Sequence, residues 1–380
     1  MRKSERFRPR YHFTPRENWM NDPNGLVHID GGYHLYYQHN PYGTEWGHMS
    51  WGHATSQDLV TWEHHPVAIW ERPEEGYTIF SGSAVVDREN LSGFGTDDAA
   101  ALVAIYTADR QAADPHVQDK HVASSLDGGF SLVPYPDNPV VAIGERKFGD
   151  PKVFWHGPTQ RWIMVAICGL GQGHAVLYAS PDLKSWTQLS EFHAPDVAPG
   201  VWECPDLFPL AVDGDPRDVR WVMKVNGSPF GGGTSRTRFF LGTFDGETFS
   251  SAQLVGSSLT SDAGALYAEV TYNGVPEGRR VLVGWLRQQA VEGRPWTGAQ
   301  SVPRLLTLRS TEDGVALCQS PVEGLKTLRG ARMTLHEREL TAPVTLDKVD
   351  ATSGSLEVLT VFDMRSATEV GIRLHLRDGN

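Results

Sequence analysis

A pattern of short β-type segments recurs along this chain of 380 residues with a period of roughly 60 residues. In each copy a strand-like run ends in Ser or Thr, and an Asp follows two positions later with Leu or Gly directly after it. Such a sequence is typical of a tight turn, and we place it between the two outer strands of a four-stranded unit. The aspartates of the pattern are Asp58, Asp127, Asp182, Asp245 and, with a looser match, Asp313.

A second recurrence lies out of phase with the first and marks where each unit begins. Each unit opens on a short polar element, continues into a strand, turns, and returns as an apolar run. The openings lie near Asp22, Gly82, Asp150, Glu203 and Tyr267. The returning runs cover residues 33–38, 101–107, 161–167, 221–225 and 280–286. Five units of four short strands predict an all-β chain folded as a five-bladed β-propeller, in which neighbouring blades cover each other's faces. A β-sandwich with coincidental spacing is the alternative.

The repeat ends after the fifth unit, and the pattern of apolar and polar residues changes there. Segments that alternate like the strands of another β domain lie at 332–340, 344–350, 355–363 and 369–377. A β-sandwich of ordinary size needs about 100 residues, and fewer remain here. We therefore predict two domains, a propeller at 1–328 and the first part of a truncated β-sandwich at 329–380.

Charge and composition argue against several classes of partner. The chain carries 34 Lys and Arg against 46 Asp and Glu, a net charge of −12, and has no basic run. No nucleic-acid or anionic-membrane surface is therefore expected, and no apolar run reaches the ~18 residues of a membrane span. Three scattered cysteines predict neither a disulfide framework nor a zinc site. Residues 1–10 lack the apolar core of a signal peptide, so we expect a cytoplasmic protein, or a secreted one if a leader has been removed. The oligomeric state is not indicated.

Three carboxylates occupy equivalent openings of the repeat, at Asp22, Asp150 and Glu203. The first strand of each blade lines the channel of a propeller, so these side chains are expected to converge at one end of it. Each lies within two residues of a proline, which fixes the local backbone. Glycosidic cleavage needs one carboxylic acid and one carboxylate, and a third anion can stabilise oxocarbenium charge. Simple turns or a calcium site are the alternatives, although no Asp-rich calcium loop is present.

Four motifs stand in order along the chain. They read Trp-Met-Asn-Asp-Pro-Asn-Gly at 19–25, Phe-Ser-Gly-Ser at 80–83, Asp-Pro-Lys-Val-Phe-Trp at 150–155 and Trp-Glu-Cys-Pro-Asp-Leu-Phe at 202–208. Together they resemble glycoside hydrolase family 32, which contains invertases, levanases, inulinases and fructan transferases. The resemblance extends from Tyr11 to Leu328, and within the family the residues of the motifs are most similar to those of bacterial levanases and exo-acting fructan hydrolases. It implies a five-bladed propeller followed by a β-sandwich.

The resemblance also implies a role for each carboxylate: Asp22 as the nucleophile, Glu203 as the general acid/base and Asp150 as a stabiliser of the transition state. The implied reaction retains configuration through a covalent fructosyl-enzyme, with the two catalytic carboxyls about 5 Å apart. We expect a raised pKa at Glu203 and an ionised Asp22. No metal and no cofactor is implied. The positions implied to line the fructose subsite, with Trp19 packing beneath it, are Asn21, Gln38, Trp46, Phe80, Ser81 and Trp296.

The sequence departs from the family pattern beside these residues. Gly149 stands where the family usually has Arg, and either Arg146 or Lys147 is a candidate replacement. Thr297 also stands in place of an Arg, and segment 262–268 lacks a usual acid. We expect a β-fructosidase that releases fructose from levan, inulin or sucrose-type ends. The alternatives are a fructan fructotransferase of the same fold, which forms difructose anhydride or longer transfer products, and a non-catalytic fructan-binding propeller.

Overall fold

The computed structural model describes residues 8–196, 198–228, 235–251, 259–263, 265–287, 292–334, 339, 344 and 355–372 of the chain. The chain divides into two units, Met1–Leu325 and Lys326–Asn380. The first unit holds every β-strand of the described residues. Among those residues no helix is both long and apolar enough to cross a membrane.

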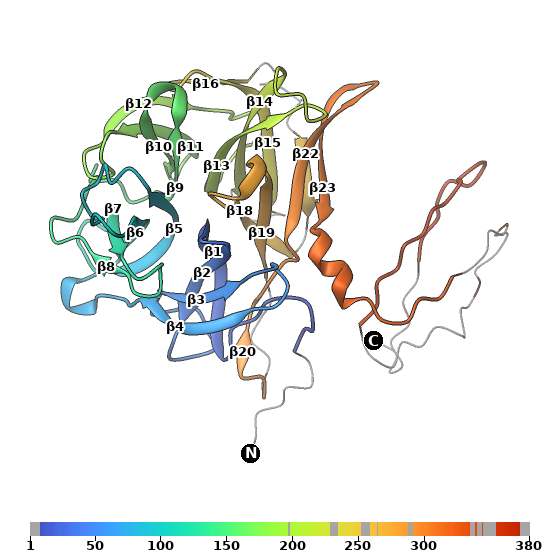
Figure 1. Cartoon of the computed structure of the whole chain (residues 1–380), viewed down its shortest axis with the longest axis horizontal. Coiled ribbons are helices and arrows are strands. Elements are labelled where there is room, and N and C mark those ends of the chain that lie inside the picture. Colours follow the sequence, from blue (N-terminus) through green and yellow to red (C-terminus); the bar gives the residue numbers. More distant parts are fainter. Residues whose placement is uncertain are drawn as a thin grey trace. The chain divides into compact units, whose positions relative to one another are not determined.

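Five sheets of mainly antiparallel strands make up the first unit (Figure 1). The first contains β1 (Asn18–Ile29), β2 (Gly32–Asn40), β3 (Ser50–Ser56) and β4 (Glu63–Ile69), and the second β5 (Thr78–Asp87), β6 (Ala101–Arg110), β7 (Val117–Ser125) and β8 (Val133–Pro134). The third contains β9 (Phe148–His156), β10 (Arg161–Cys168), β11 (His174–Ser180) and β12 (Thr187–Phe192). The fourth contains β13 (Val201–Ala211), β14 (Val219–Ser228), β15 (Arg236–Phe244), β16 (Phe249–Ser251) and β17 (Leu259–Ala263). The fifth contains β18 (Leu266–Thr271), β19 (Arg280–Leu286), β21 (Ala299–Gln300), β22 (Arg304–Thr311) and β23 (Gly314–Pro321). Short 3-10 turns lie at Pro73–Glu75, Gly157–Thr159, Pro276–Gly278 and Glu323–Leu328.

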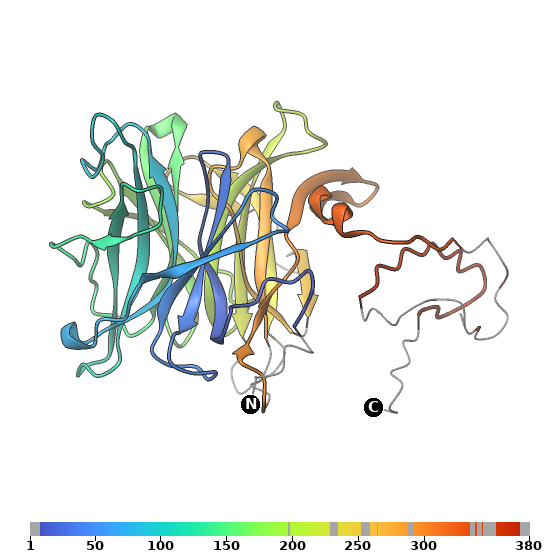
Figure 2. The ribbon, with the colours of Figure 1, turned by 60° about the horizontal axis from the view of Figure 1, so that its bottom comes forward.

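The five sheets close into a ring, which confirms the predicted β-propeller (Figure 1, Figure 2). The first strand of each blade contacts the first strand of the next, in the order β1, β5, β9, β13, β18 and back to β1. Hydrogen bonds also close the ring. The short strand β20 (Trp296–Thr297) lies between β19 and β21 of the fifth blade in the sequence, and it pairs in parallel with β1 of the first blade. All five predicted openings lie on these inner strands.

The predicted apolar runs form the second strand of each blade. Along β6 and β10 nearly every side chain is buried, whichever face of the sheet it points to. A second strand has neighbours on both edges and other blades across both faces, so it reads as a continuous apolar run instead of an alternating one.

The Ser-x-Asp sequence forms the predicted hairpin turn between the third and fourth strands. The carboxylate of Asp58 accepts hydrogen bonds from the backbone N–H groups of Val60 (2.8 Å) and Thr61 (2.7 Å). Asp182 accepts the equivalent pair in the third blade. The side chain thereby satisfies donors that the turn leaves without a backbone acceptor. The repeated Ser-x-Asp sequence therefore corresponds to the same hairpin turn in these blades.

Each inner strand is irregular at its opening residue. The register of β1 with β2 shifts between Met20 and Pro23, and that of β13 with β14 shifts between Glu203 and Asp206. Equivalent shifts involve residues 80–82, 149–152 and 267–270 in the other three inner strands. A β-bulge bends its strand and re-aims a side chain. These irregularities therefore set the direction of the side chains at the openings.

The described residues of the second unit contain no β-strand. The segments predicted as strands lie partly outside the described residues, and where they are described, at 332–334, 339, 344, 355–363 and 369–372, they form none. Leu359 and Val361 are 90% and 93% exposed there. A strand is stable only when it pairs with a neighbour and buries one face, and these residues do neither. The β-sandwich stays a prediction.

Two buried histidines make the first blade sensitive to acid. His34 Nδ1 lies 3.0 Å from His53 Nε2, and the ring of His53 stacks on Tyr36 with centroids 4.4 Å apart. Burial, together with the neighbouring imidazoles, lowers the pKa of His34 to about 4 and that of His53 to about 2. The folded chain therefore binds fewer protons here than the unfolded chain, in which His titrates near about 6.5.

We expect these histidines to contribute stability that is present above about pH 6.5 and is lost progressively as the pH falls toward 4. Thermal unfolding measured between pH 7.5 and 4 would show this as a falling Tm. The double variant His34→Phe/His53→Phe should have a flatter dependence of Tm on pH. Parallel Tm curves for the parent and the variant would contradict the assignment.

Candidate active site

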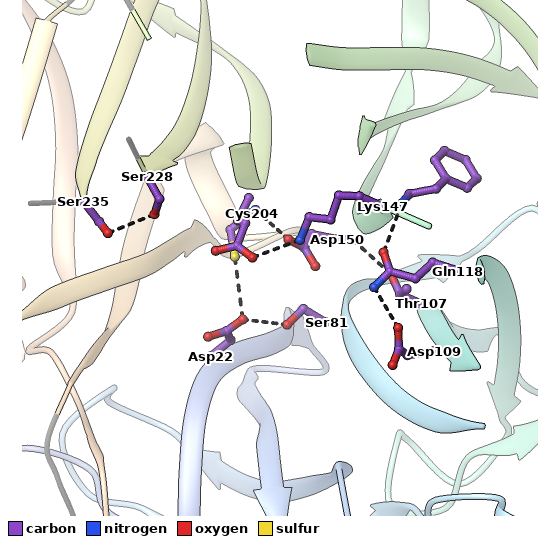
Figure 3. A network of polar contacts seen from close by, with 12 residues as sticks. Asp22, Ser81, Thr107, Asp109, Gln118, Lys147, Asp150, Cys204, Ser228 and Ser235 are labelled. Carbon is purple, nitrogen blue, oxygen red and sulfur yellow. Dashed lines mark hydrogen bonds and ion pairs between the residues drawn. The ribbon is translucent and has the colours of Figure 1, made fainter. Parts of the chain in front are cut away.

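Cys204 connects two of the three predicted carboxylates in the centre of the propeller (Figure 3). Its backbone N–H donates to Asp150 Oδ2 (2.9 Å), and its thiol donates to Asp22 Oδ2 at 3.7 Å. Glu203 precedes it on β13, so carboxylates from the first, third and fourth blades come together. Burial raises the pKa of the Cys204 thiol, which keeps it neutral and able to donate. The convergence predicted from the repeat is therefore present.

Asp22 lies at the irregular register shift of β1, and two further side chains hold it besides the Cys204 thiol. Ser81 Oγ donates to its Oδ2 (2.8 Å) and Asn21 Nδ2 donates to its Oδ1 (3.1 Å). Trp19 Nε1 in turn donates to Asn21 Oδ1 (2.7 Å). Burial and the negative charge of Asp150 nevertheless raise the pKa of Asp22 to about 6, because the two hydrogen bonds only partly offset them. Asp22 is oriented firmly, but it binds a proton more readily than an ordinary aspartate.

Asp150 is positioned through its own backbone. Its N–H donates to Thr107 Oγ1 (3.0 Å) of the second blade, and its φ of 57° lies in the left-handed region. Asp tolerates that region better than most residues that carry a Cβ. The carboxylate then accepts from the N–H of Cys204 in the fourth blade. Asp150 is therefore fixed between two blades.

Glu203 carries an ion pair with a residue of the third blade. Lys147 Nζ lies 2.9 Å from its Oε1, and the Tyr267 hydroxyl of β18 donates to its Oε2. The Glu203 side chain is 34% exposed, whereas that of Lys147 is 13% exposed. Of the two candidate replacements for the missing Arg, Lys147 makes the contact, and Arg146 is exposed. Neighbouring blades thus hold the Glu203 carboxylate from two sides.

The pKa order of the two expected catalytic carboxyls is the reverse of the predicted one. Burial acts to raise the pKa of Glu203, but the Lys147 ammonium and the Tyr267 hydroxyl outweigh it, and the pKa is lowered. The expected raised pKa at Glu203 is therefore wrong for the free protein, whereas Asp22, with its pKa raised to about 6, is still mostly ionised at pH 7. The motifs revealed that an Arg was missing, but they did not reveal the cation that replaces it. The raised pKa of Asp22 and the lowered pKa of Glu203 thus favour Asp22 over Glu203 as the place of a single proton in this site.

Lys147 lies beside the space that a side chain at residue 149 would enter. A Cβ at Gly149 would lie 3.7 Å from Lys147 Nζ and 3.3 Å from Gln118 Oε1. That Gln118 oxygen already accepts from the N–H of Phe148 (3.0 Å), so it has little freedom to move. The choice of residue at 147 is therefore coupled to that at 149, because Lys147 lies where a side chain at residue 149 would extend.

The other predicted binding residues divide into exposed and buried ones. Trp46 is 52% exposed, and its ring meets that of Phe80 edge-on with centroids 6.1 Å apart. Gln38 is buried, and its Nε2 has no hydrogen-bond partner among the described residues. Trp296 is 1% exposed, with the guanidinium of Arg8 4.1 Å above its ring. Trp296 therefore supports β1 and offers no open face to a sugar in this structure. Substrate contacts stay predictions for these side chains.

Several residues that hydrogen-bond to the site were given no role from the sequence. Tyr267 opened the fifth unit of the repeat, so its place on an inner strand could be predicted, but its contact with Glu203 could not. Thr107 and Gln118 belong to the second and third strands of the second blade, and no motif marks them. Their contacts form across blades, which no spacing along the chain reveals.

A group of possible metal ligands lies at the outer strands β11 and β12 of the third blade. His193 Nε2 lies 2.9 Å from Glu191 Oε2, and His174 Nε2 lies 3.9 Å from the same oxygen. The three ligand atoms lie within 4.8 Å of one another. The sequence analysis expected no metal site and did not single out these residues. The group shares no residue with the carboxylate site.

Comparison with known proteins agrees with this geometry. The model of the glycosyl hydrolases family 32 N-terminal domain matches residues 12–321, which include all three carboxylates. The levanase of Bacillus subtilis (strain 168) is 47% identical over 338 residues, which cover 86% of this chain and 48% of the levanase. The extracellular exo-inulinase inuE of Aspergillus niger is 39% identical, covering 85% of this chain and 66% of that protein.

A solved structure shares the same fold. The fructofuranosidase from Schwanniomyces occidentalis complexed with fructose superimposes with a TM-score of 0.76 at 36% identity, covering 84% of this chain and 64% of that chain. The chain thus spans about half the length of the levanase (48%) and about two thirds (66%) of the exo-inulinase.

Proposed function

This chain belongs to glycosyl hydrolase family 32, and we propose that it is a retaining β-fructosidase that hydrolyses terminal β-D-fructofuranosyl units of fructans or sucrose. The observation that carries the proposal is the meeting of Asp22, Asp150 and Glu203 from three blades, linked by Cys204, inside the matched domain. Three neighbouring carboxylates suit a reaction that needs a nucleophile, a proton donor and an anion near developing positive charge. The levanase and exo-inulinase relatives support fructans as the substrate class.

In the proposed reaction Asp22 attacks the anomeric carbon of the fructosyl unit while Glu203 donates a proton to the leaving oxygen. A covalent fructosyl-enzyme forms, and Asp150 stabilises the oxocarbenium charge on the way to it. Glu203, now ionised, then removes a proton from water, which attacks the same carbon and releases fructose with its configuration retained. Lys147 makes Glu203 a stronger acid for the first step and a weaker base for the second, since it favours the ionised form.

We expect kcat/KM to follow a bell-shaped pH profile centred below about pH 6. Turnover needs one proton in the site, with Asp22 ionised and Glu203 protonated. Above about pH 6 the site loses that proton, and below the lowered pKa of Glu203 it gains a second one that blocks Asp22. Initial rates at substrate concentrations far below KM, measured from pH 3.5 to 9, test this. A plateau that extends through pH 8 would contradict it.

The product profile tests the proposal itself. The protein would be incubated in parallel with levan, inulin and sucrose, and the products separated by chromatography, with Asp22→Asn as the inactive control. Free fructose as the main product supports a hydrolase, and NMR of the first product should show the β-anomer. Difructose anhydride or longer transfer products would replace the proposal with a fructotransferase. Binding of the polymers without turnover would replace it with a binding propeller.

A further inference from the structure

The three most exposed Trp and Tyr side chains of the described residues gather on the first blade. Tyr42 is 64% exposed, Trp46 is 52% exposed and Trp70 is 50% exposed. Trp46 belongs to the predicted fructose subsite, but Tyr42 and Trp70 have no part in the site described above. We call these two residues the rim pair. Neighbouring apolar side chains left open to water typically mark a binding surface.

The exposed position of Tyr42 is built by its loop. The loop between β2 and β3 is bonded to β1, because the N–H of Trp19 donates to the carbonyl of Gly43 (2.9 Å) and Asn18 Nδ2 donates to the carbonyl of Pro41 (2.6 Å). The backbone on both sides of Tyr42 is thus fixed to the strand that carries the expected nucleophile, and the ring is bordered by those of His48 and Trp70. A side chain that is already ordered loses little entropy when it binds a ligand.

Trp70 reaches the same place from the end of β4. Its ring centroid lies 6.3 Å from that of Tyr42, with the planes inclined at 45°. The following residue, Glu71, is held by His48 Nδ1 (2.9 Å), and the His48 ring meets Tyr42 edge-on at 5.2 Å. The N–H of Glu71 also donates to Ser50 Oγ (2.9 Å). Aromatic rings bordered by a carboxylate and an imidazole suit a ligand with apolar C–H faces and many hydroxyl groups.

The loop that carries Tyr42 also carries a residue that leads toward the carboxylate site. Trp46 lies four residues after Tyr42 on the same loop, and its ring contacts Phe80. Ser81, the next residue, donates to Asp22. Phe80 thus adjoins the residue that holds Asp22, Trp46 contacts Phe80, and the rim pair belongs to the same blade as Trp46. A sugar chain that leaves the site over this blade can meet all three exposed aromatic side chains.

From this arrangement we propose that Tyr42 and Trp70 form an accessory subsite that stacks on units of a fructan chain beyond the bond that is cleaved. The inference rests on the proposed function and names its substrate class as polymeric fructan. Sucrose supplies only one unit beyond the fructosyl group, whereas levan and inulin supply a chain. The rim pair should therefore favour polymers and contribute nothing to sucrose hydrolysis.

The double variant Tyr42→Ala/Trp70→Ala tests the proposal kinetically. We expect kcat/KM for levan or inulin to fall about tenfold, while kcat/KM for sucrose changes by less than about twofold. Leu126→Ala is the matched control, because Leu126 is 49% exposed and follows β7 at the end of the second blade away from Phe80. It should change neither value. An equal loss on polymers and sucrose, or no loss on polymers, would overturn the proposal.

A binding measurement separates this inference from the proposed activity. In native gels that contain levan or inulin, an Asp22→Asn protein should be retarded, and adding the two rim substitutions should abolish the retardation. Equal retardation of both proteins, or retardation of neither, overturns the accessory subsite. If the parent cleaves none of the three substrates, the proposed function fails, yet the gel still decides whether the rim pair binds fructan. Thermal unfolding confirms that each variant is folded.

Discussion

Asp22→Asn is expected to lower kcat on fructans and sucrose by about 10⁴-fold or more, because an amide cannot attack the anomeric carbon. The same substitution should raise the Tm at pH 7. Burial raises the pKa of Asp22 to about 6, so its ionised form is less favourable in the folded chain than in the unfolded one. Asn removes that unfavourable charge and nearly preserves the shape. Rates and thermal unfolding, measured on one preparation, test both expectations.

Glu203→Gln is the matched control, because it changes the proton donor and leaves the nucleophile intact. With a fructoside whose leaving group needs no proton, this variant should release one equivalent of leaving group in a burst and then turn over slowly. Asp22→Asn should show no burst with the same substrate. If Asp22→Asn keeps more than about one hundredth of the parent's kcat, the nucleophile is another residue.

Lys147→Met is expected to move the alkaline limb of the kcat/KM profile to higher pH. Without the ammonium, only the Tyr267 hydroxyl and the positive charge of Arg287 oppose the effect of burial on Glu203, so the pKa of Glu203 rises. The proton in the site then shifts from Asp22 toward Glu203. The ratio of kcat/KM at pH 8 to that at pH 5 should increase. Since the carboxylate also loses one of the two groups that position it, kcat at the optimum should fall about 10- to 100-fold.

Moving the cation from residue 147 to residue 149 shows whether Lys147→Met acts through the position of the Glu203 carboxylate or through a loss of folding. Adding Gly149→Arg to Lys147→Met places a cation in the vacated space, and it should return the pH profile and most of kcat toward the parent. Gly149→Arg alone should impair the enzyme, because its side chain would enter the space beside Lys147, whose Nζ lies 3.7 Å from the position of the added Cβ, and would place a second cation next to the lysine. If Lys147→Met left both the pH profile and kcat unchanged, the ion pair with Glu203 would have no part in turnover.

Much of the fold could be predicted from the sequence because its causes are local. The Ser-x-Asp turns depend on a carboxylate that bonds backbone groups two and three residues away, and the second strands are apolar because both faces are covered. The two periodic signals therefore predicted the number of blades and the inner strand of each. The same periodicity predicted that Asp22, Asp150 and Glu203 would meet, since equivalent positions of a propeller share one axis.

The state of each carboxyl was decided by the tertiary structure. The pKa values depend on burial and on charges that lie close in space but belong to different blades, such as Lys147 beside Glu203 and Asp150 beside Asp22. The spacing of residues along the sequence does not show whether the lysine of one blade contacts the carboxylate of another, or where a strand contains a β-bulge. For the same reason Trp296, which the family resemblance implied at the fructose subsite, is buried on the strand that pairs with β1. Local bonding and burial patterns thus determined the blades from sequence, whereas through-space electrostatics and side-chain direction required the assembled propeller.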